Sequence, residues 1–350
     1  MTTWQSHLEQ HNAVFDLAAP AINVAGLNNP LQPVGTWLVD LAHLGSNTVS
    51  GEDAIAFLGG QFTNDVRALS ADRCQLNGWC NPQGRLLALF RITRHGDTIV
   101  LQLPRALVEP MLKRLRMFVL RSKVTLADSS ADWARFGVMG DTADTALRSV
   151  FAAVPMTVDA VSHERDVAVI RAPGTAPRWE IVGPLAAAQT VWNALAPHAH
   201  VAPSSLWRLH DIAAGQPQIY AETSGEFIPQ MVNLQAIGGV NFKKGCYPGQ
   251  EIVARMQYLG KLKRRMTSAE CTLDAPPAPG ADIVLADTPE QKVGHVVTAE
   301  MAAPHRVALL AVIELSAATQ PLMLPATRTA LNVTTLPYDP AATSQTATAS

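Results

Sequence analysis

The sequence has no apolar run long enough to cross a membrane, and residues 1–20 scatter His, Glu and Asp where a secretory signal has an apolar segment. Cysteine is scarce: the chain has 4, with no C-x-x-C pair and no metal-ligand spacing to histidine. These absences predict a cytosolic protein with reduced thiols, without a membrane partner and without a metal site.

A strong net charge is also missing. Lys and Arg number 27 and Asp and Glu 29, which gives a formal net charge of -2 and argues against a general nucleic-acid binder. There is no internal repeat. A chain of 350 residues with 48% hydrophobic residues is typical of a globular protein with about two or three domains. The last stretch, residues 339–350, is rich in Ala, Ser and Thr and is expected to be a disordered tail.

One stretch departs from this neutrality. Residues 241–265, NFKKGCYPGQEIVARMQYLGKLKRR, hold seven Lys or Arg and one acid. Within it, Cys246 follows two lysines and precedes Pro248-Gly249, a pair that fits a type II turn. A helix is predicted to begin at Gln250. A helix start and nearby lysines both favour the thiolate form of a cysteine. The alternative is a buried cysteine that acts as a small apolar residue, but the polar and charged neighbours argue against deep burial and predict an accessible Cys246.

Strand-like and helix-like segments alternate through most of the chain. Strands are predicted over residues 37–40, 85–93, 98–103, 167–171 and 179–182, and helices from residues 51, 104 and 204. A Pro/Ala-rich break, residues 271–280, is the best domain boundary. After it, residues 292–298 and 306–315 suit a small all-β module. The pattern predicts an α+β fold.

Several motifs together resemble the YgfZ family, the folate-binding relatives of the glycine-cleavage aminomethyltransferase. The residues that match its K-G-C-Y-x-G-Q-E signature are Lys244, Gly245, Cys246, Tyr247, Gly249, Gln250 and Glu251, followed by Arg255. Further similarity lies in VDLAHLG (39–45), GEDAIAFLGGQFTNDV (51–66), CNPQGRLLALF (80–90), GEFIPQMVNLQAIGGVNF (225–242) and VGHVVTAE (293–300).

This resemblance implies a ring-like aminomethyltransferase-type body with a folate pocket, over residues 1–268, and a C-terminal β-barrel over residues 272–338. Two interleaved α+β domains would divide the body near residues 130 and 205. The implied role is to support the assembly or repair of iron–sulfur enzymes, including tRNA-modifying ones, with tetrahydrofolate bound. Cys246 is the candidate catalytic residue, and the motif residues Lys244, Tyr247, Gln250, Glu251 and Arg255 surround it.

One departure separates this chain from the aminomethyltransferases. In those enzymes an acid pair follows the glycine turn, whereas here Ala88 and Leu89 stand at the aligned positions. Loss of a positioned acid or base costs such chemistry a factor of roughly 10²–10⁴. An accessory folate-binding protein is therefore favoured over a one-carbon transferase. A third reading, a module that binds protein or tRNA, would use the basic patch from Lys243 to Arg265.

The resemblance also indicates folate contacts, each with a plainer alternative. Trp207 is expected to lie off the apolar stripe of its helix, where it could stack on the ligand or pack against another domain. Leu44 offers an apolar contact. Asn64 could bind the ligand or cap a turn, and Arg85 could meet the glutamate tail or build a turn. Glu180 could pair with the pterin. His198 and His200 lack a third ligand and are interpreted as loop residues.

Overall fold

The computed structural model describes residues 3–10 and 19–343. Its contacts divide the chain into two units. Unit 1 holds residues 1–51, 69–74 and 92–211, and unit 2 holds residues 52–68, 75–91 and 212–350. The two units thus interleave along the chain. One division follows residue 211, close to the one expected near 205, and none falls near residue 130.

A six-stranded sheet forms the centre of unit 1. Its order is β11 (His200–Ala202), β1 (Trp37–Asp40), β7 (Trp133–Met139), β10 (Arg178–Pro184), β9 (Val167–Arg171) and β8 (Val161–Glu164). Only the pair β1–β11 is parallel among the pairings described in this sheet.

Both faces of this sheet are covered, which is why all four residues of β1 are buried. Leu38 belongs to the core cluster shared with α5 (Leu185–Leu195), whose Trp192 is fully buried. Trp37 and Val39 point to the opposite face and share a cluster with residues of α6 (Ser204–Ala213). On the first face lie also α1 (Trp4–Gln10) and α4 (Ala143–Arg148).

Unit 1 has a second layer of strands. β2 (Leu44–Ser50) pairs antiparallel with β5 (Thr98–Pro104) on one side and β6 (Thr125–Asp128) on the other. The helix α3 (Arg105–Arg116) follows Pro104 directly and packs on these strands. Pro104 was expected to open a helix, and it stands at the N-cap position.

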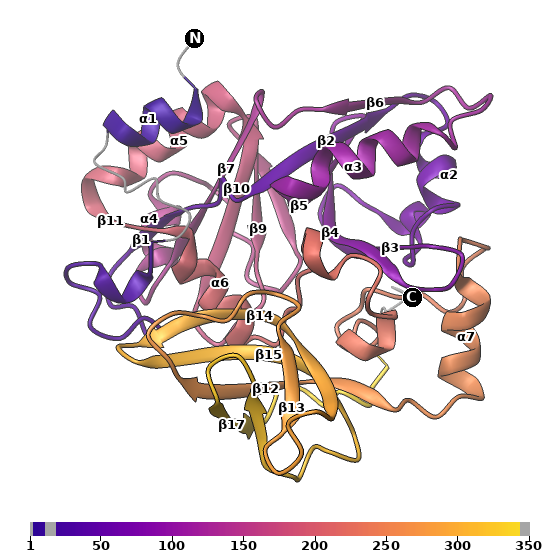
Figure 1. Cartoon of the computed structure of the whole chain (residues 1–350). Helices are drawn as coiled ribbons and strands as arrows, with labels where there is room; N and C mark the ends of the chain where they lie inside the picture. The colour runs from indigo at the N-terminus through magenta and orange to yellow at the C-terminus, as the bar shows by residue number, and fades with distance from the viewer. Residues whose placement is uncertain (1–2, 11–18, 344–350) are drawn as a thin grey trace. The chain divides into compact units, whose positions relative to one another are not determined.

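Unit 2 contains a closed β-barrel near its C-terminal end (Figure 1). Its order is β12 (Arg264–Thr272), β15 (Arg306–Glu314), β14 (Lys292–Ala303), β13 (Asp282–Leu285), β16 (Leu322–Leu324) and β17 (Thr329–Thr334). The barrel therefore begins at Arg264, and the start expected at residue 272 is wrong. The Pro/Ala-rich break connects two strands of the barrel rather than two domains. The strand that precedes it, β12, pairs with β15 and β17, which both follow it.

The other elements of unit 2 are α2 (Ala54–Gly59), β3 (Gln75–Cys80), the first part of β4 (Leu86–His95) and α7 (Gln250–Tyr258). The tail was expected to be disordered from residue 339, which is wrong for its first residues. Nε2 of Gln235 donates hydrogen bonds to the carbonyls of Pro340 and Ala342. Residues 344–350 lie outside the described residues.

Candidate functional site

The cysteine motif forms a turn at the start of α7, as the sequence predicts. Gly249 has φ of +80°, a conformation that glycine adopts without strain, and α7 begins at Gln250. The backbone N–H of Tyr247 donates to Oε1 of Gln250, which closes the turn on its own motif. Cys246 is exposed, whereas Cys74, Cys80 and Cys271 are buried. The expectation of an accessible Cys246 is confirmed.

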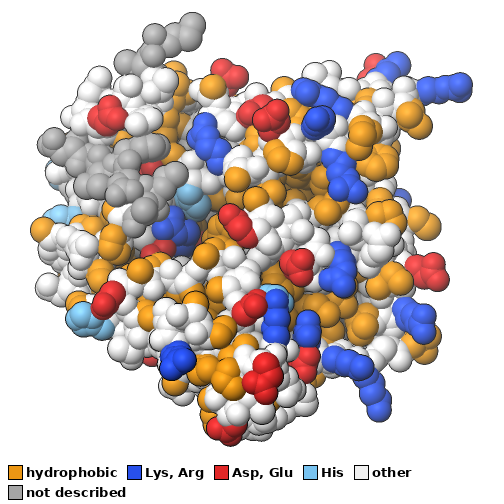
Figure 2. Space-filling view, viewed as in Figure 1, with side chains coloured by type: hydrophobic (Ala, Val, Ile, Leu, Met, Phe, Trp, Pro, Cys, Tyr) orange, Lys and Arg blue, Asp and Glu red, His pale blue; other side chains and the backbone are white. Residues whose placement is uncertain are grey.

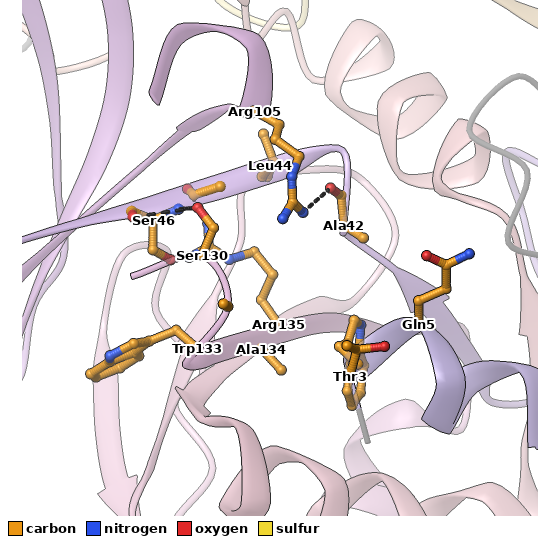
Figure 3. A pocket seen from close by; sticks show the side chains of 13 residues that line it. Thr3, Gln5, Ala42, Leu44, Ser46, Arg105, Ser130, Trp133, Ala134 and Arg135 are labelled. Carbon is orange, nitrogen blue, oxygen red and sulfur yellow. Dashed lines mark hydrogen bonds between the residues drawn. The ribbon is translucent and has the colours of Figure 1, made fainter. Parts of the chain in front are cut away.

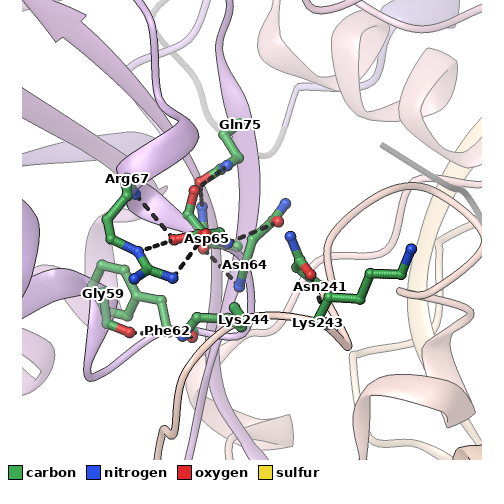
Figure 4. A network of polar contacts seen from close by, with 10 residues as sticks. Gly59, Phe62, Asn64, Asp65, Arg67, Gln75, Asn241, Lys243 and Lys244 are labelled. Carbon is green, nitrogen blue, oxygen red and sulfur yellow. Dashed lines mark hydrogen bonds and ion pairs between the residues drawn. The ribbon is translucent and has the colours of Figure 1, made fainter. Parts of the chain in front are cut away.

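Lys244 fastens this turn to α2 (Figure 4). Its side chain is only 7% exposed, and Nζ donates to the carbonyls of Gly59 and Phe62 at 2.7 and 2.6 Å. Nζ also lies 4.7 Å from the ring centre of Tyr247. Burial lowers the pKa of Lys244 to about 8, although Asp65 and Cys246 act in the opposite direction. Lys244 thus fixes the turn to the end of α2 rather than contributing an exposed charge.

A polar network, buried at Asn64 and exposed at Arg67, lies next to Lys244 (Figure 4). Nδ2 of Asn64 donates to the carbonyls of Leu76 and Gly238 at 3.1 and 2.8 Å, and its Oδ1 accepts from the backbone N–H of Asp65. Asp65 in turn bonds to Arg67, which lowers the pKa of the carboxyl. The side chain of Asn64 therefore holds backbone segments together. This is closer to the turn-capping role than to the ligand contact, which stays a prediction.

The NPQGR segment packs against the cysteine turn. A Cβ on Gly249 would lie 2.4 Å from the carbonyl oxygen of Asn81, and one on Gly84 would lie 2.9 Å from the side chain of Ile252. Oδ1 of Asn81 accepts from the N–H of Arg85, and the exposed guanidinium of Arg85 donates to the carbonyl of Glu226. Arg85 thus helps to build the turn. Its guanidinium is exposed, and the expected contact with the glutamate tail of folate stays a prediction.

The remaining motif residues divide by exposure. Tyr247 is buried, and burial raises the pKa of its hydroxyl. Glu251 and Arg255 are exposed on α7. The structure therefore links Lys244, Tyr247 and Gln250 to one another in the turn that carries Cys246, and it leaves Glu251 and Arg255 exposed on α7.

The basic patch from Lys243 to Arg265 is weaker than its composition suggests. Lys244 is buried, and Nη2 of Arg264 pairs with Glu314 in the barrel at 2.8 Å. Figure 2 shows Lys and Arg side chains beside apolar ones at the lower right, over α7 and the segment that follows it. Tyr258 and Leu259 are 68% and 84% exposed there. The surface is thus mixed apolar and basic.

A second candidate site is a pocket of about 360 Å³ inside unit 1 (Figure 3). Leu44, which was predicted to offer an apolar contact to folate, is one of its lining residues. Its other lining residues are Thr3, Trp4, Gln5, Ala42, Gly45, Ser46, Arg105, Ser130, Ala131, Trp133, Ala134 and Arg135. The sequence reasoning missed Arg105 and Arg135. The signal for Arg135 is a single arginine within the apolar run WARFGVM.

Arg135 is 3% exposed, and its guanidinium donates to the carbonyl of Gly45 at 3.2 Å and to Oγ of Ser46. Burial lowers the pKa of this guanidinium, against the influence of Glu180. Glu180 is itself buried and accepts a hydrogen bond from Nε2 of Gln102 at 3.0 Å. Glu180 does not line the pocket, so its expected pterin contact stays a prediction.

The expectation that Trp207 lies off the apolar stripe is wrong. Its side chain is 4% exposed and belongs to the core cluster around Trp37. One face of the ring packs on the backbone of Gly137, where a Cβ would lie 2.5 Å away, and the guanidinium of Arg178 lies 4.6 Å from the ring centre. Trp207 therefore packs in the core of this structure, and its stacking on a ligand stays a prediction.

The histidine pair belongs to no metal site among the described residues, which hold no group of three or more His, Cys, Asp or Glu placed to bind a metal ion. The ring of His200 packs against Trp37 with their centres 4.7 Å apart. In the described parts of the chain, none of the helices combines the length and apolar character that crossing a bilayer requires.

The fold belongs to a known class. Residues 34–202 match the family model described as the GCVT N-terminal domain. The chain is similar to the glycine cleavage system aminomethyltransferase T of Bartonella henselae, with a TM-score of 0.72 over 97% of each chain at 14% identity. This likeness shows an α+β fold of the aminomethyltransferase type with a C-terminal β-barrel, as the motifs indicated.

Relatives at higher identity define the family. The chain is 34% identical over 241 residues to the tRNA-modifying protein YgfZ of Colwellia psychrerythraea, covering 69% of this chain and 74% of the relative. It is 33% identical over 266 residues to the tRNA-modifying protein YgfZ of Yersinia pseudotuberculosis, covering 76% and 78%. The chain belongs to the YgfZ family.

Proposed function

We propose that this chain is a cytosolic, folate-binding accessory protein that supports tRNA modification by assisting the assembly or repair of iron–sulfur enzymes. The observation that carries this proposal is the thiol of Cys246, which is exposed on a turn that Lys244 anchors from below. An exposed thiol on a rigid turn is suited to transient contact with a client protein. The link to tRNA modification comes from the relatives, which are named tRNA-modifying proteins.

Tetrahydrofolate is the proposed ligand. The fold is that of an aminomethyltransferase, and the pocket in unit 1 combines apolar groups such as Leu44 with polar and cationic ones. Pockets for small organic ligands commonly have this mixture. The proposal assigns tRNA to the client enzymes rather than to this chain, because two of the seven basic residues of the patch are buried or ion-paired.

Aminomethyl transfer is the competing function, and the interior of unit 2 argues against it. Ala88 and Leu89, at the positions of the enzymes' acid pair, are 1% and 2% exposed in the core. Neither side chain can accept a proton or hold an amine, so the positioned acid that this chemistry requires is missing at these two positions.

The test combines binding with turnover. Calorimetry should detect tetrahydrofolate binding by the full chain, while an assay with an aminomethylated lipoyl donor should form no methylene-tetrahydrofolate. A glycine-cleavage aminomethyltransferase serves as the positive control for both measurements. Absence of binding would refute the folate role, and turnover above the uncatalysed rate would establish the transferase instead.

A further inference from the structure

The pocket in unit 1 is cationic at its lining. It contains two arginines, Arg105 and Arg135, and neither Asp nor Glu occurs among its lining residues. The two guanidinium groups are close enough that the charge of Arg105 lowers the pKa of Arg135. Like charges at one cavity repel each other, so this arrangement becomes favourable when an anion lies between them.

Arg135 is the more unusual of the two. Its guanidinium is buried, yet the hydrogen-bond acceptors recorded for it are neutral: the carbonyl of Gly45 and the hydroxyl of Ser46. Glu180 influences it through space, but no ion pair joins Arg135 to a carboxylate among the described residues. Burying a charge without a counter-ion is costly, so a bound anion would compensate it.

Arg105 faces the same pocket from the first residue of α3 (Figure 3). This side chain is exposed, and its guanidinium donates a hydrogen bond from Nη1 to the carbonyl of Ala42 that is long at 3.4 Å. The N-terminus of α3 lies here too, and the positive end of a 12-residue helix favours an anion. The hydroxyl groups of Ser46 and Ser130 also lie at the pocket.

The lining also has an apolar part. Its larger apolar side chains are those of Leu44 and Trp133, together with Trp4 from α1. Nε1 of Trp4 donates to Oδ1 of Asp40 at 3.1 Å, which fixes the helix that forms this wall. A free inorganic anion makes no apolar contacts, so the pocket suits an anionic group that is attached to an organic molecule.

We propose that Arg105 and Arg135 form a carboxylate-binding subsite in this pocket. For the identity of the ligand, the inference rests on the proposed folate function: the carboxylates of the glutamate end of tetrahydrofolate would lie between the two guanidinium groups. Arginine binds carboxylates through two parallel hydrogen bonds, which gives both strength and direction.

The experiment compares tetrahydrofolate with its α,γ-diamide, in which both glutamate carboxylates are neutral amides. The wild-type full chain should bind the acid about tenfold or more tightly than the diamide, as expected for hydrogen bonds to charged groups. In Arg105→Gln this preference should fall to about twofold or less. Arg94→Gln, an exposed arginine outside the pocket, is the matched control and should keep the wild-type preference.

Arg135→Gln should show the same loss of preference. Because Arg135 is buried, this variant can fail to fold. In that case the result for the exposed Arg105 decides the test. Equal affinity of the wild type for acid and diamide would overturn the subsite. So would an Arg105→Gln variant that keeps the full preference.

Failure of the folate role is distinguishable from failure of the subsite. If the wild type binds neither compound, its melting temperature is measured in inorganic phosphate and in sodium chloride of equal ionic strength. A rise specific to phosphate that Arg105→Gln abolishes would support an anion subsite for another ligand. An identical response to both salts, or in both proteins, would overturn it.

Discussion

Asp40 holds a carboxyl group in an environment that disfavours its charge. Burial raises its pKa to about 6, although hydrogen bonds from Trp4 and Ala42 and the charge of Arg105 oppose the shift. An acid whose pKa is higher in the folded than in the unfolded state stabilises the fold when protonated. Its contribution is complete below about pH 3.8 and is lost as the pH rises through about 6.

We therefore predict that Asp40→Asn flattens part of the pH dependence of stability. Relative to wild type, the variant should gain about 1–3 kcal/mol in the free energy of unfolding between pH 4 and 7.5, since one pKa unit corresponds to about 1.4 kcal/mol. Urea unfolding at several pH values measures this difference. Asp97→Asn, at a fully exposed carboxyl, is the control. Parallel pH profiles for wild type and Asp40→Asn would contradict the prediction.

Single residues also mark where prediction from sequence ends. The exposure of Cys246 could be predicted because its neighbours in the chain are polar and charged. The burial of Trp207 could not be predicted, since placing a residue off the apolar stripe assumes that the opposite face of the helix is solvated. Nearly every residue from Ser204 to His210 is buried, so α6 has no such face. Arg135 was missed for a related reason: the groups that bind its guanidinium, the carbonyl of Gly45 and the hydroxyl of Ser46, are distant from it in the chain.

At the scale of elements, the turn before α7 depends on a contact between two loops. Gly249 lies against Asn81 and Gly84, so the cysteine motif and the NPQGR segment fit each other only without a side chain at this position. Local signals predicted both turns separately, from Pro-Gly and from Gly84. Their contact could not be predicted from spacing, because 165 or more residues separate them, between Gly84 and Gly249.

We predict that Gly249→Ala destabilises the protein by about 1–3 kcal/mol, because a Cβ strains a positive φ and collides with backbone. Gly245→Ala, in the same motif, is the matched control. A Cβ there meets nothing within 4 Å, and the change should stay within about 0.5 kcal/mol. Urea unfolding of both variants provides the comparison. Equal stability of the two would show that the two loops do not constrain each other.

Elements with strong local sequence patterns were predicted correctly. Domain boundaries that depend on strand pairing were not. The strand predicted over 167–171 matches β9 residue for residue, and α7 begins at the predicted Gln250. The barrel start was wrong because the Pro/Ala-rich break resembles a linker. Only the pairing of β12 with β15 and β17 shows that the barrel extends across it.

At the scale of the whole molecule, the two candidate sites belong to different units. The pocket is lined by residues of unit 1, and the turn around Cys246 is built within unit 2. Each site is assembled from segments far apart in the chain, such as Lys244 with Gly59 or Arg135 with Ser46. Variants at one site can therefore leave the local contacts of the other intact.

The four thiols provide a direct way to probe the second site. Burial raises the pKa of Cys80 to about 12 and also raises that of Cys271, and Cys74 is buried beside Asp159. Iodoacetamide should therefore modify Cys246 at least about tenfold faster than the others in the native protein. Mass spectrometry ranks the rates, and the same reaction in denaturant, where all four thiols are accessible, is the control.

We predict that Cys246→Ser abolishes function in the cell while sparing both the fold and folate binding. Serine preserves size and polarity but does not supply a thiolate, and the exposed side chain makes no core contact, so the melting temperature should change by less than about 2 °C. Calorimetry should give wild-type affinity for tetrahydrofolate, whereas the variant should fail to restore tRNA modification in a strain that lacks the protein. Arg105→Gln should show the converse in vitro: weakened folate binding with wild-type alkylation of Cys246. Full complementation by Cys246→Ser, or a Cys246 that reacts no faster than Cys80, would mean that the thiol is not the active group and that the function depends on the pocket of unit 1 alone.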